Sequence, residues 1–365
     1  MRNGGARRVL LAALTAVLAL GAAEGLCRLA PEPAAPLAGD GIHLLGNPYL
    51  LWELRPGDHD ELGVRVHVNR DGLRGPELGP KRGPRLLSVG DSSVYGFGVE
   101  DGAVWSDVAG RALGVEVLNG AVPGYSSYQA INLLTMRGLA TDPDVLVIGT
   151  LWSDNNFDSF SDATLLAAHA GWSARVWHWQ RLLRESALFR RLDWVIRVRP
   201  AGERARKVGW TVGGDDARTG ARRVPIEEYA RNLDTLARLM ADRGKGVVFL
   251  LLANRDDVDL RPPEPAWAPY RAVMRDAAAR FGAPLVDVPA AFQASGRSAD
   301  ALFLDKMHPS ELGHSLVGAA VADALADTGW PRTPLVAAAS AARPGRYVDP
   351  FVDRAVDPGP RPSGE

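Results

Sequence analysis

Short apolar runs with β character alternate along this chain with segments that have helical spacing. Strands are expected at residues 85–89, 115–118, 145–148, 247–252 and 285–288, and helices at residues 104–113, 126–138, 226–243, 270–281 and 309–326. Strands that alternate with helices form a parallel sheet covered on both faces. The predicted fold is therefore α/β, a three-layer flavodoxin-like α/β/α sandwich.

A basic N-terminus precedes an apolar segment. Arg7 and Arg8 come just before the run Val9–Ala23, and such a pattern is typical of a secretory signal or a membrane anchor. The basic end is expected in the cytoplasm and the rest of the chain across the membrane. A cleaved signal would release a secreted protein. Glu24 and Arg28 favour an uncleaved anchor, because they disrupt the small-residue pattern of a cleavage site.

Composition changes suggest further boundaries. We expect a signal-anchor or signal peptide at residues 1–29, a Pro- and Ala-rich linker at 30–46, an irregular lead-in at 47–84, a main domain at 85–330 and a disordered tail at 331–365. The stretch 158–224 is too long for a simple crossover, so it is predicted to be a helical insertion.

The insertion contains an unusual stretch, residues 172–199, in which four tryptophans lie among seven arginines. A helix with an apolar, tryptophan-bearing face and cationic surroundings suits an anionic membrane interface. The alternative is a cap helix that packs on the main domain with its arginines in water. Stacking of sugars on the tryptophans is a third use.

Charge and cysteine content exclude several classes of protein. The net charge of −1 gives no electrostatic footprint for nucleic acid. A single cysteine, Cys27, allows no intrachain disulfide and no cysteine-based zinc site. The seven histidines show no metal-ligand spacing, and no glycine-rich phosphate loop follows the first strand. We therefore predict neither a metal nor a cofactor.

Polar loops follow four of the predicted strands. Ser92 lies in Gly90-Asp91-Ser92, Gly124 in the loop after the second strand, Ser153-Asp154-Asn155 after the third, and Asp305 and His308 after the fifth. A parallel sheet brings these loops to one edge. Nucleophile, base, orienting carboxylate and oxyanion donors then share one cleft, as acyl transfer requires.

In this order the four loops resemble the motif blocks of the SGNH (GDSL-type) hydrolase family. The stretch Tyr95-Gly96-Phe97-Gly98-Val99-Glu100-Asp101 is similar to a membrane-associated bacterial branch. The resemblance implies that Ser92 is the nucleophile and that the N–H groups of Ser92 and Gly124 form the oxyanion hole. It also implies that His308 is the general base and then acid, and that Asp305 orients it.

The third block departs from the family at Ser153, where an asparagine side chain usually donates to the oxyanion. Either the Ser153 hydroxyl or Asn155 would then be the third donor. Losing one donor costs roughly 100- to 1000-fold in rate, so the departure bears on how active the enzyme is.

The sequence thus predicts a serine esterase without a cofactor. Its expected partners are an ester-bearing small molecule, lipid or acylated glycan, and the membrane through its N-terminus. Two alternatives keep the same cleft: an O-acyltransferase or deacetylase of cell-surface polysaccharide, and a catalytically weak, membrane-tethered binding protein.

Overall fold

The chain divides into two compact units, one with residues 1–40 and 172–214 and one with residues 41–171 and 215–365. The computed structural model describes residues 3–30, 43–47, 49–158, 161–167, 183, 186–193, 195–196, 221–261 and 267–338. In the first unit the described helices are α1 (Asn3–Leu29) and α7 (Ala187–Asp193). Most of the predicted insertion and of its tryptophan- and arginine-rich stretch lies outside the described residues.

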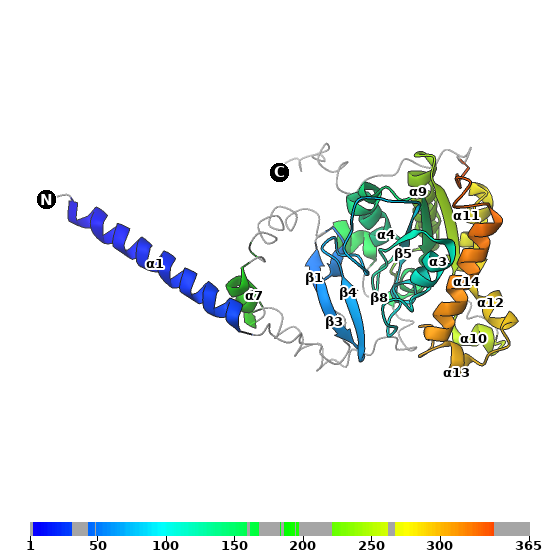
Figure 1. The fold of residues 1–365 in the computed structure, drawn as a ribbon, viewed down its shortest axis with the longest axis horizontal. Helices are drawn as coiled ribbons and strands as arrows, with labels where there is room; N and C mark the ends of the chain where they lie inside the picture. The colour runs from blue at the N-terminus through cyan, green and yellow to red at the C-terminus, as the bar shows by residue number, and fades with distance from the viewer. Residues whose placement is uncertain are drawn as a thin grey trace, which may run out of the picture. The chain divides into compact units, whose positions relative to one another are not determined.

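The second unit is built on a five-stranded parallel sheet (Figure 1). Its order is β11-β10-β7-β5-β6, with bounds β5 (Arg85–Gly90), β6 (Glu116–Asn119), β7 (Val145–Gly149), β10 (Gly246–Leu251) and β11 (Leu285–Asp287). Counted along the chain this is the order 2-1-3-4-5 of flavodoxin-like sheets. The prediction of a three-layer α/β fold is confirmed.

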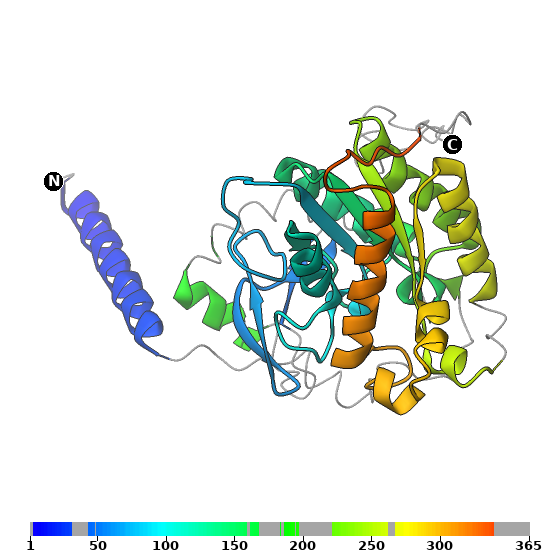
Figure 2. The same cartoon turned by 45° about the vertical axis from the view of Figure 1, so that its right-hand side comes forward.

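Helices cover both faces of this sheet (Figures 1 and 2). One layer pairs α3 (Trp105–Leu113) with α14 (Glu311–Asp327), and the other contains α4 (Ser127–Leu133), α9 (Ile226–Ala241) and α11 (Ala268–Phe281). The shorter helices are α2 (Ser92–Tyr95), α5 (Trp152–Asn155), α10 (Arg255–Val258), α12 (Val288–Ala294) and α13 (Ala299–Leu302). A π-helical turn (Leu134–Gly138) and a 3-10 turn (Leu139–Thr141) follow α4.

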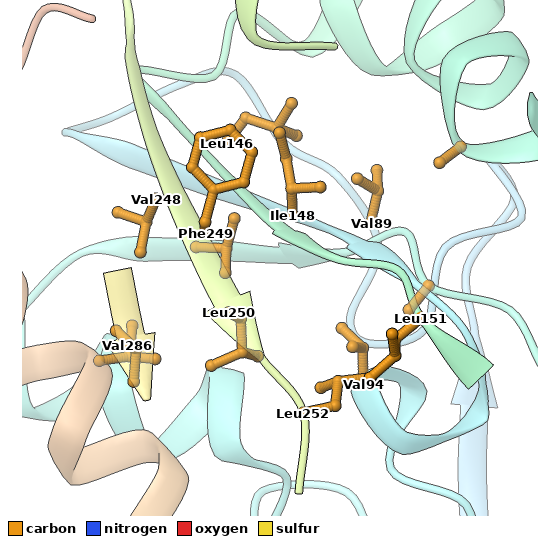
Figure 3. Close-up of a cluster of buried hydrophobic side chains, with 14 of the residues drawn as sticks. Val89, Val94, Leu146, Ile148, Leu151, Val248, Phe249, Leu250, Leu252 and Val286 are labelled. Atoms are coloured by element: carbon orange, nitrogen blue, oxygen red, sulfur yellow. The ribbon is translucent and has the colours of Figure 1, made fainter. Parts of the chain in front are cut away.

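Continuous apolar runs in the central strands form the core. Every residue of β5, β7 and β10 is buried, as expected for strands that are covered on both faces. Figure 3 shows Val89, Ile148 and Phe249 from these three strands gathered with Val94 of α2 and Val286 of β11. The loops that carry polar residues therefore begin at the ends of strands that the packed core holds in place.

The segment before the sheet is more regular than expected. It contains two antiparallel hairpins, β1 (Leu44–Asn47) with β2 (Leu51–Leu54) and β3 (Gly57–Glu61) with β4 (Val64–Val68). These strands have only four or five residues each, too few for a periodic pattern to predict them, yet buried side chains such as Leu54 and Val66 join the core. A further antiparallel pair, β8 (Phe157–Asp158) with β9 (Ala221–Arg222), brings together the two ends of the predicted insertion.

Two boundaries near the C-terminus also differ from expectation. Helix α14 begins at Glu311 rather than Pro309, because the Ser310 side chain accepts a hydrogen bond from the Gly313 N–H and caps the helix. Residues 331–338, expected to be disordered, pack along the sheet: the Ala337 N–H donates to the Lys245 carbonyl at 3.1 Å. The rest of the predicted tail lies outside the described residues.

The N-terminal helix has the length and composition of a membrane span. Within Arg7–Leu29, a stretch of 18 residues has a mean hydropathy of 2.1. A signal sequence passes the same test, so this observation fits both an anchor and a signal peptide.

We expect Leu335→Ala to lower the free energy of unfolding by about 1–2 kcal/mol, because Leu335 packs against β10 at Gly246. The control is Val336→Ala, whose side chain is 55% exposed and whose effect should stay within about 0.5 kcal/mol. Urea unfolding of residues 41–365 measures both. Equal effects would mean that residues 331–338 contribute nothing to stability.

Candidate active site

Ser92 lies where β5 turns sharply into α2. A Cβ at Gly90 would stand 2.5 Å from the Gly149 carbonyl oxygen and 2.6 Å from Val94 Cγ2. Only glycine fits, because the ends of β5 and β7 pass this close to each other and to α2. The turn puts Ser92 at the N-terminus of α2, at the carboxyl edge of the sheet.

The structure brings Ser92, His308 and Asp305 into one hydrogen-bonded chain. Ser92 Oγ lies 2.7 Å from His308 Nε2, and His308 Nδ1 lies 2.6 Å from Asp305 Oδ2. Ser92 and His308 are 216 residues apart in sequence, whereas Asp305 belongs to the same loop as His308. This is the relation of nucleophile, base and orienting carboxylate that acyl transfer uses.

Asp305 carries a negative charge in this arrangement. Partial burial opposes its ionisation, but the hydrogen bond and the charge of His308, with the N–H groups of Met307 and His308, lower the Asp305 pKa to about 2. An ionised carboxylate accepts, so His308 Nδ1 donates to Asp305. His308 Nε2 is then the acceptor of the Ser92 hydroxyl proton.

Neighbouring residues hold the His308 ring and its loop. The ring packs against Phe97, with centroids 4.8 Å apart. Ser93 Oγ donates to the Met307 carbonyl at 3.0 Å, which ties the histidine loop to the residue after Ser92. The Leu304 N–H donates to the His308 carbonyl at 2.8 Å, so the loop closes on itself.

Gly124 follows β6, the neighbour of β5 in the sheet. Its φ of 82° is left-handed, and a Cβ there would lie 2.9 Å from Trp52 Cζ2, so both conformation and space require glycine. Trp52 Nε1 donates to the Pro123 carbonyl at 3.0 Å, and the Tyr125 hydroxyl donates to the Trp52 carbonyl at 2.7 Å. Trp52 therefore fixes the loop that presents the Gly124 N–H.

A buried carboxylate, Asp91, joins the Ser92 turn to the loop after β7. Asp91 accepts from the N–H groups of Ser93 and Trp152, each at 3.0 Å, and also from Ser153 N–H. It thereby caps the starts of both α2 and α5. Burial raises the pKa of Asp91 to about 6. Sequence analysis missed this role, because an acidic residue beside a serine in a turn is usually exposed.

A second buried carboxylate, Asp154, continues the connection to the Gly124 loop. Its oxygens lie 2.9 and 3.2 Å from the Ser127 N–H, at the first residue of α4. The Ser127 hydroxyl also hydrogen-bonds to Asp154 and accepts from Asn232 of α9. Burial raises the pKa of Asp154 to about 7. The sequence placed Asp154 in the third block but did not indicate that Ser127 would be its partner.

The two candidates for a third oxyanion donor have different surroundings. Asn155 accepts hydrogen bonds from Arg222 at its carbonyl and at its side-chain oxygen. The Ser153 N–H is taken by Asp91, so only the hydroxyl of Ser153 remains to donate. Both residues are buried.

Arg74 is a further residue that sequence analysis missed. Its guanidinium, 2% exposed, donates to the Tyr95, Gly96 and Val99 carbonyls and to Asp101. It therefore holds the loop that carries Phe97. Sequence analysis missed Arg74 because this residue lies in the lead-in, far from any motif.

A sequence profile of the GDSL-like lipase/acylhydrolase family matches residues 153–316. This confirms the resemblance to GDSL-type hydrolases and the predicted enzyme class, a hydrolase that acts on ester bonds. The match includes Ser153, Asp305 and His308 and begins after Ser92 and Gly124. No curated protein matches the chain by sequence.

Several solved structures are similar to this chain. A lipase/acylhydrolase from Enterococcus faecalis has 16% identity and a TM-score of 0.43, over 67% of this chain and 96% of that one. An alpha/beta hydrolase from the metagenome of Lake Arreo, Spain, has 18% identity and a TM-score of 0.43, over 67% and 96%. An acetylxylan esterase from Geobacillus stearothermophilus has 17% identity and a TM-score of 0.41, over 67% and 94%.

The raised pKa of Asp91 predicts a pH-dependent stability. In the unfolded chain an aspartate titrates near about 3.9, so between about pH 4 and 6 the folded protein keeps a proton that the unfolded chain has lost. Stability should fall as pH rises through this window, relative to the always neutral Asp91→Asn. Urea unfolding of both proteins at about pH 4, 5, 6 and 7 measures the difference, and a difference that does not change with pH would contradict the raised pKa.

Proposed function

We propose that this chain, which carries a GDSL-like lipase/acylhydrolase domain, is a serine esterase that hydrolyses carboxylic esters through an acyl-enzyme at Ser92. The observation that carries the proposal is the continuous chain from Ser92 Oγ through His308 to Asp305, with spacings of 2.7 and 2.6 Å. Such a chain activates a hydroxyl that is otherwise a weak nucleophile.

In the first half of the reaction Ser92 Oγ attacks the ester carbonyl carbon, and its proton passes to His308 Nε2. The ionised Asp305 stabilises the imidazolium that forms. When the tetrahedral intermediate collapses, His308 returns the proton to the leaving alkoxide, and the acyl group stays on Ser92. In the second half His308 takes a proton from water while the water oxygen attacks the acyl carbon. When this second tetrahedral intermediate collapses, the bond to Ser92 Oγ breaks, His308 returns the proton to Ser92 Oγ, and the carboxylic acid leaves.

The negative oxygen of each intermediate is stabilised by the N–H groups of Ser92 and Gly124, at the start of α2 and in the loop after β6. We assign the third donor to the Ser153 hydroxyl, because Ser153 occupies the position at which the third block of the family carries the donating asparagine. A hydroxyl is one short donor, so this oxyanion hole is weaker than one completed by an asparagine amide.

We further propose that the enzyme is anchored by α1 with its catalytic domain outside the cytoplasm. The basic residues Arg7 and Arg8 precede the apolar part of the helix, in which a stretch of 18 residues has a mean hydropathy of 2.1. In that position the domain would meet ester-bearing small molecules, lipids or acylated glycans.

Fluorophosphonate labelling tests the nucleophile. Wild type should be labelled, and Ser92→Ala should not, because an activated serine is required for phosphonylation. The control is Ser295→Ala, which removes a serine hydroxyl at the end of α12 that donates to the Phe292 carbonyl and should leave a labelled protein. Labelling that persists in Ser92→Ala would refute Ser92 as the nucleophile, and a folded wild type that is not labelled would refute the esterase.

Substitutions at Ser153 test the third donor. With a nitrophenyl acetate substrate, kcat should rise at least about tenfold in Ser153→Asn and fall at least about tenfold in Ser153→Ala. Circular dichroism checks that each variant is folded. If Ser153→Ala keeps the wild-type kcat while Asn155→Ala loses it, the donor is Asn155.

A further inference from the structure

Glu24 is an acidic residue near the end of the apolar helix α1, and its carboxylate accepts hydrogen bonds from another segment of the same unit. Oε1 accepts from the Ala187 N–H at 3.0 Å, and Oε2 accepts from the Leu188 N–H at 2.9 Å and from Ser186 Oγ at 2.7 Å. Glu24 thus binds the first turn of α7, 162 residues further along the chain.

The depth of Glu24 in a membrane follows from helix geometry. With a rise of 1.5 Å per residue, Glu24 lies about 24 Å along the helix from Arg8, and the hydrocarbon core is about 30 Å thick. With Arg8 at the inner surface, Glu24 lies just inside the outer boundary. A carboxylate at this depth is costly unless it is hydrogen-bonded.

Two sources satisfy the Glu24 carboxylate. Arg28, one turn further along α1, donates from Nε to Oε1 at 2.8 Å, and its side chain is 65% exposed and so able to extend toward water. The remaining donors are those of residues 186–188. Since these groups must lie at the depth of Glu24 to bind it, α7 must lie there as well.

The surface of the same segment suits lipid. Leu192 is 50% exposed, and Val195 and Ile196, which follow α7, are 54% and 69% exposed. Large apolar side chains gathered in this way are costly in water and stable at the boundary between headgroups and acyl chains. Arg190 and Arg191 add positive charge to the segment, which favours anionic headgroups.

We propose that α7 and the residues just after it lie in the outer membrane interface beside α1, held there by Glu24. The occupant of the exposed apolar surface is the phospholipid bilayer. The arrangement requires that α1 is retained, because cleavage after Glu24 would remove the carboxylate that binds α7. It does not depend on the esterase activity.

The test uses the full chain in nanodiscs of phosphatidylcholine and phosphatidylglycerol. In a Cys27→Ser background, single cysteines replace Leu192 or, as a reference inside the bilayer, Thr15, and each carries an environment-sensitive fluorophore. Lipids spin-labelled near the headgroup should quench the probe at position 192 at least about twofold more than unlabelled lipids, because interfacial helices sit about 5–10 Å below the surface.

Adding Glu24→Ala should reduce the quenching at position 192 and leave the quenching at position 15, by lipids labelled deep in the chain, unchanged. The Thr15 reference shows that α1 is inserted in both proteins. Quenching at position 15 without quenching at position 192 would overturn the interfacial location. Quenching at position 192 that survives Glu24→Ala would overturn the role of Glu24, and an intact mass that lacks residues 1–24 in membrane-extracted protein would overturn the proposal as a whole.

Discussion

The geometry of the candidate site depends on two fully buried carboxylates, Asp91 and Asp154. Asp91 binds the starts of α2 and α5, and Asp154 binds the start of α4. Asp91 therefore joins the ends of the neighbouring strands β5 and β7, and Asp154 joins the end of β7 to the loop after β6, on the other side of β5. Backbone N–H groups at a helix start have no partner within the helix, so these carboxylates satisfy groups that the fold leaves open and tie three separate loops into one frame.

This frame holds the loops of Ser92 and Gly124, whereas the His308 loop is held separately by Phe97 and Ser93. Ser92 lies between Asp91 and the α2 turn, and Gly124 precedes the helix that Asp154 caps. Burying the two carboxyl groups has an energetic cost. Burial opposes their ionisation and therefore raises the pKa values of both. Hydrogen bonds to backbone N–H groups offset part of that cost, and the balance makes the frame sensitive to pH.

Sequence patterns predicted the sheet well because its strands are buried on both faces and read as unbroken apolar runs, such as Val145–Gly149. The loops that carry Ser92, Gly124, Asp305 and His308 were found because parallel topology sends them to one edge. Other features were missed: the hairpin strands of residues 44–68 have only four or five residues each, and Arg74 donates to carbonyls more than twenty residues away. Asp91 and Asp154 resemble exposed turn residues until their buried partners are known.

In the proposed mechanism the base His308 and its orienting carboxylate Asp305 are three residues apart, whereas the nucleophile Ser92 is 216 residues before His308. Ribosomal synthesis runs from the N-terminus, so Ser92 emerges long before His308 exists. During that interval the serine is an ordinary alcohol with nothing to remove its proton. On the proposed mechanism, the chain is therefore inert toward esters while it is being made, and it becomes reactive only after the loop before the last helix has been synthesised and has folded onto the sheet.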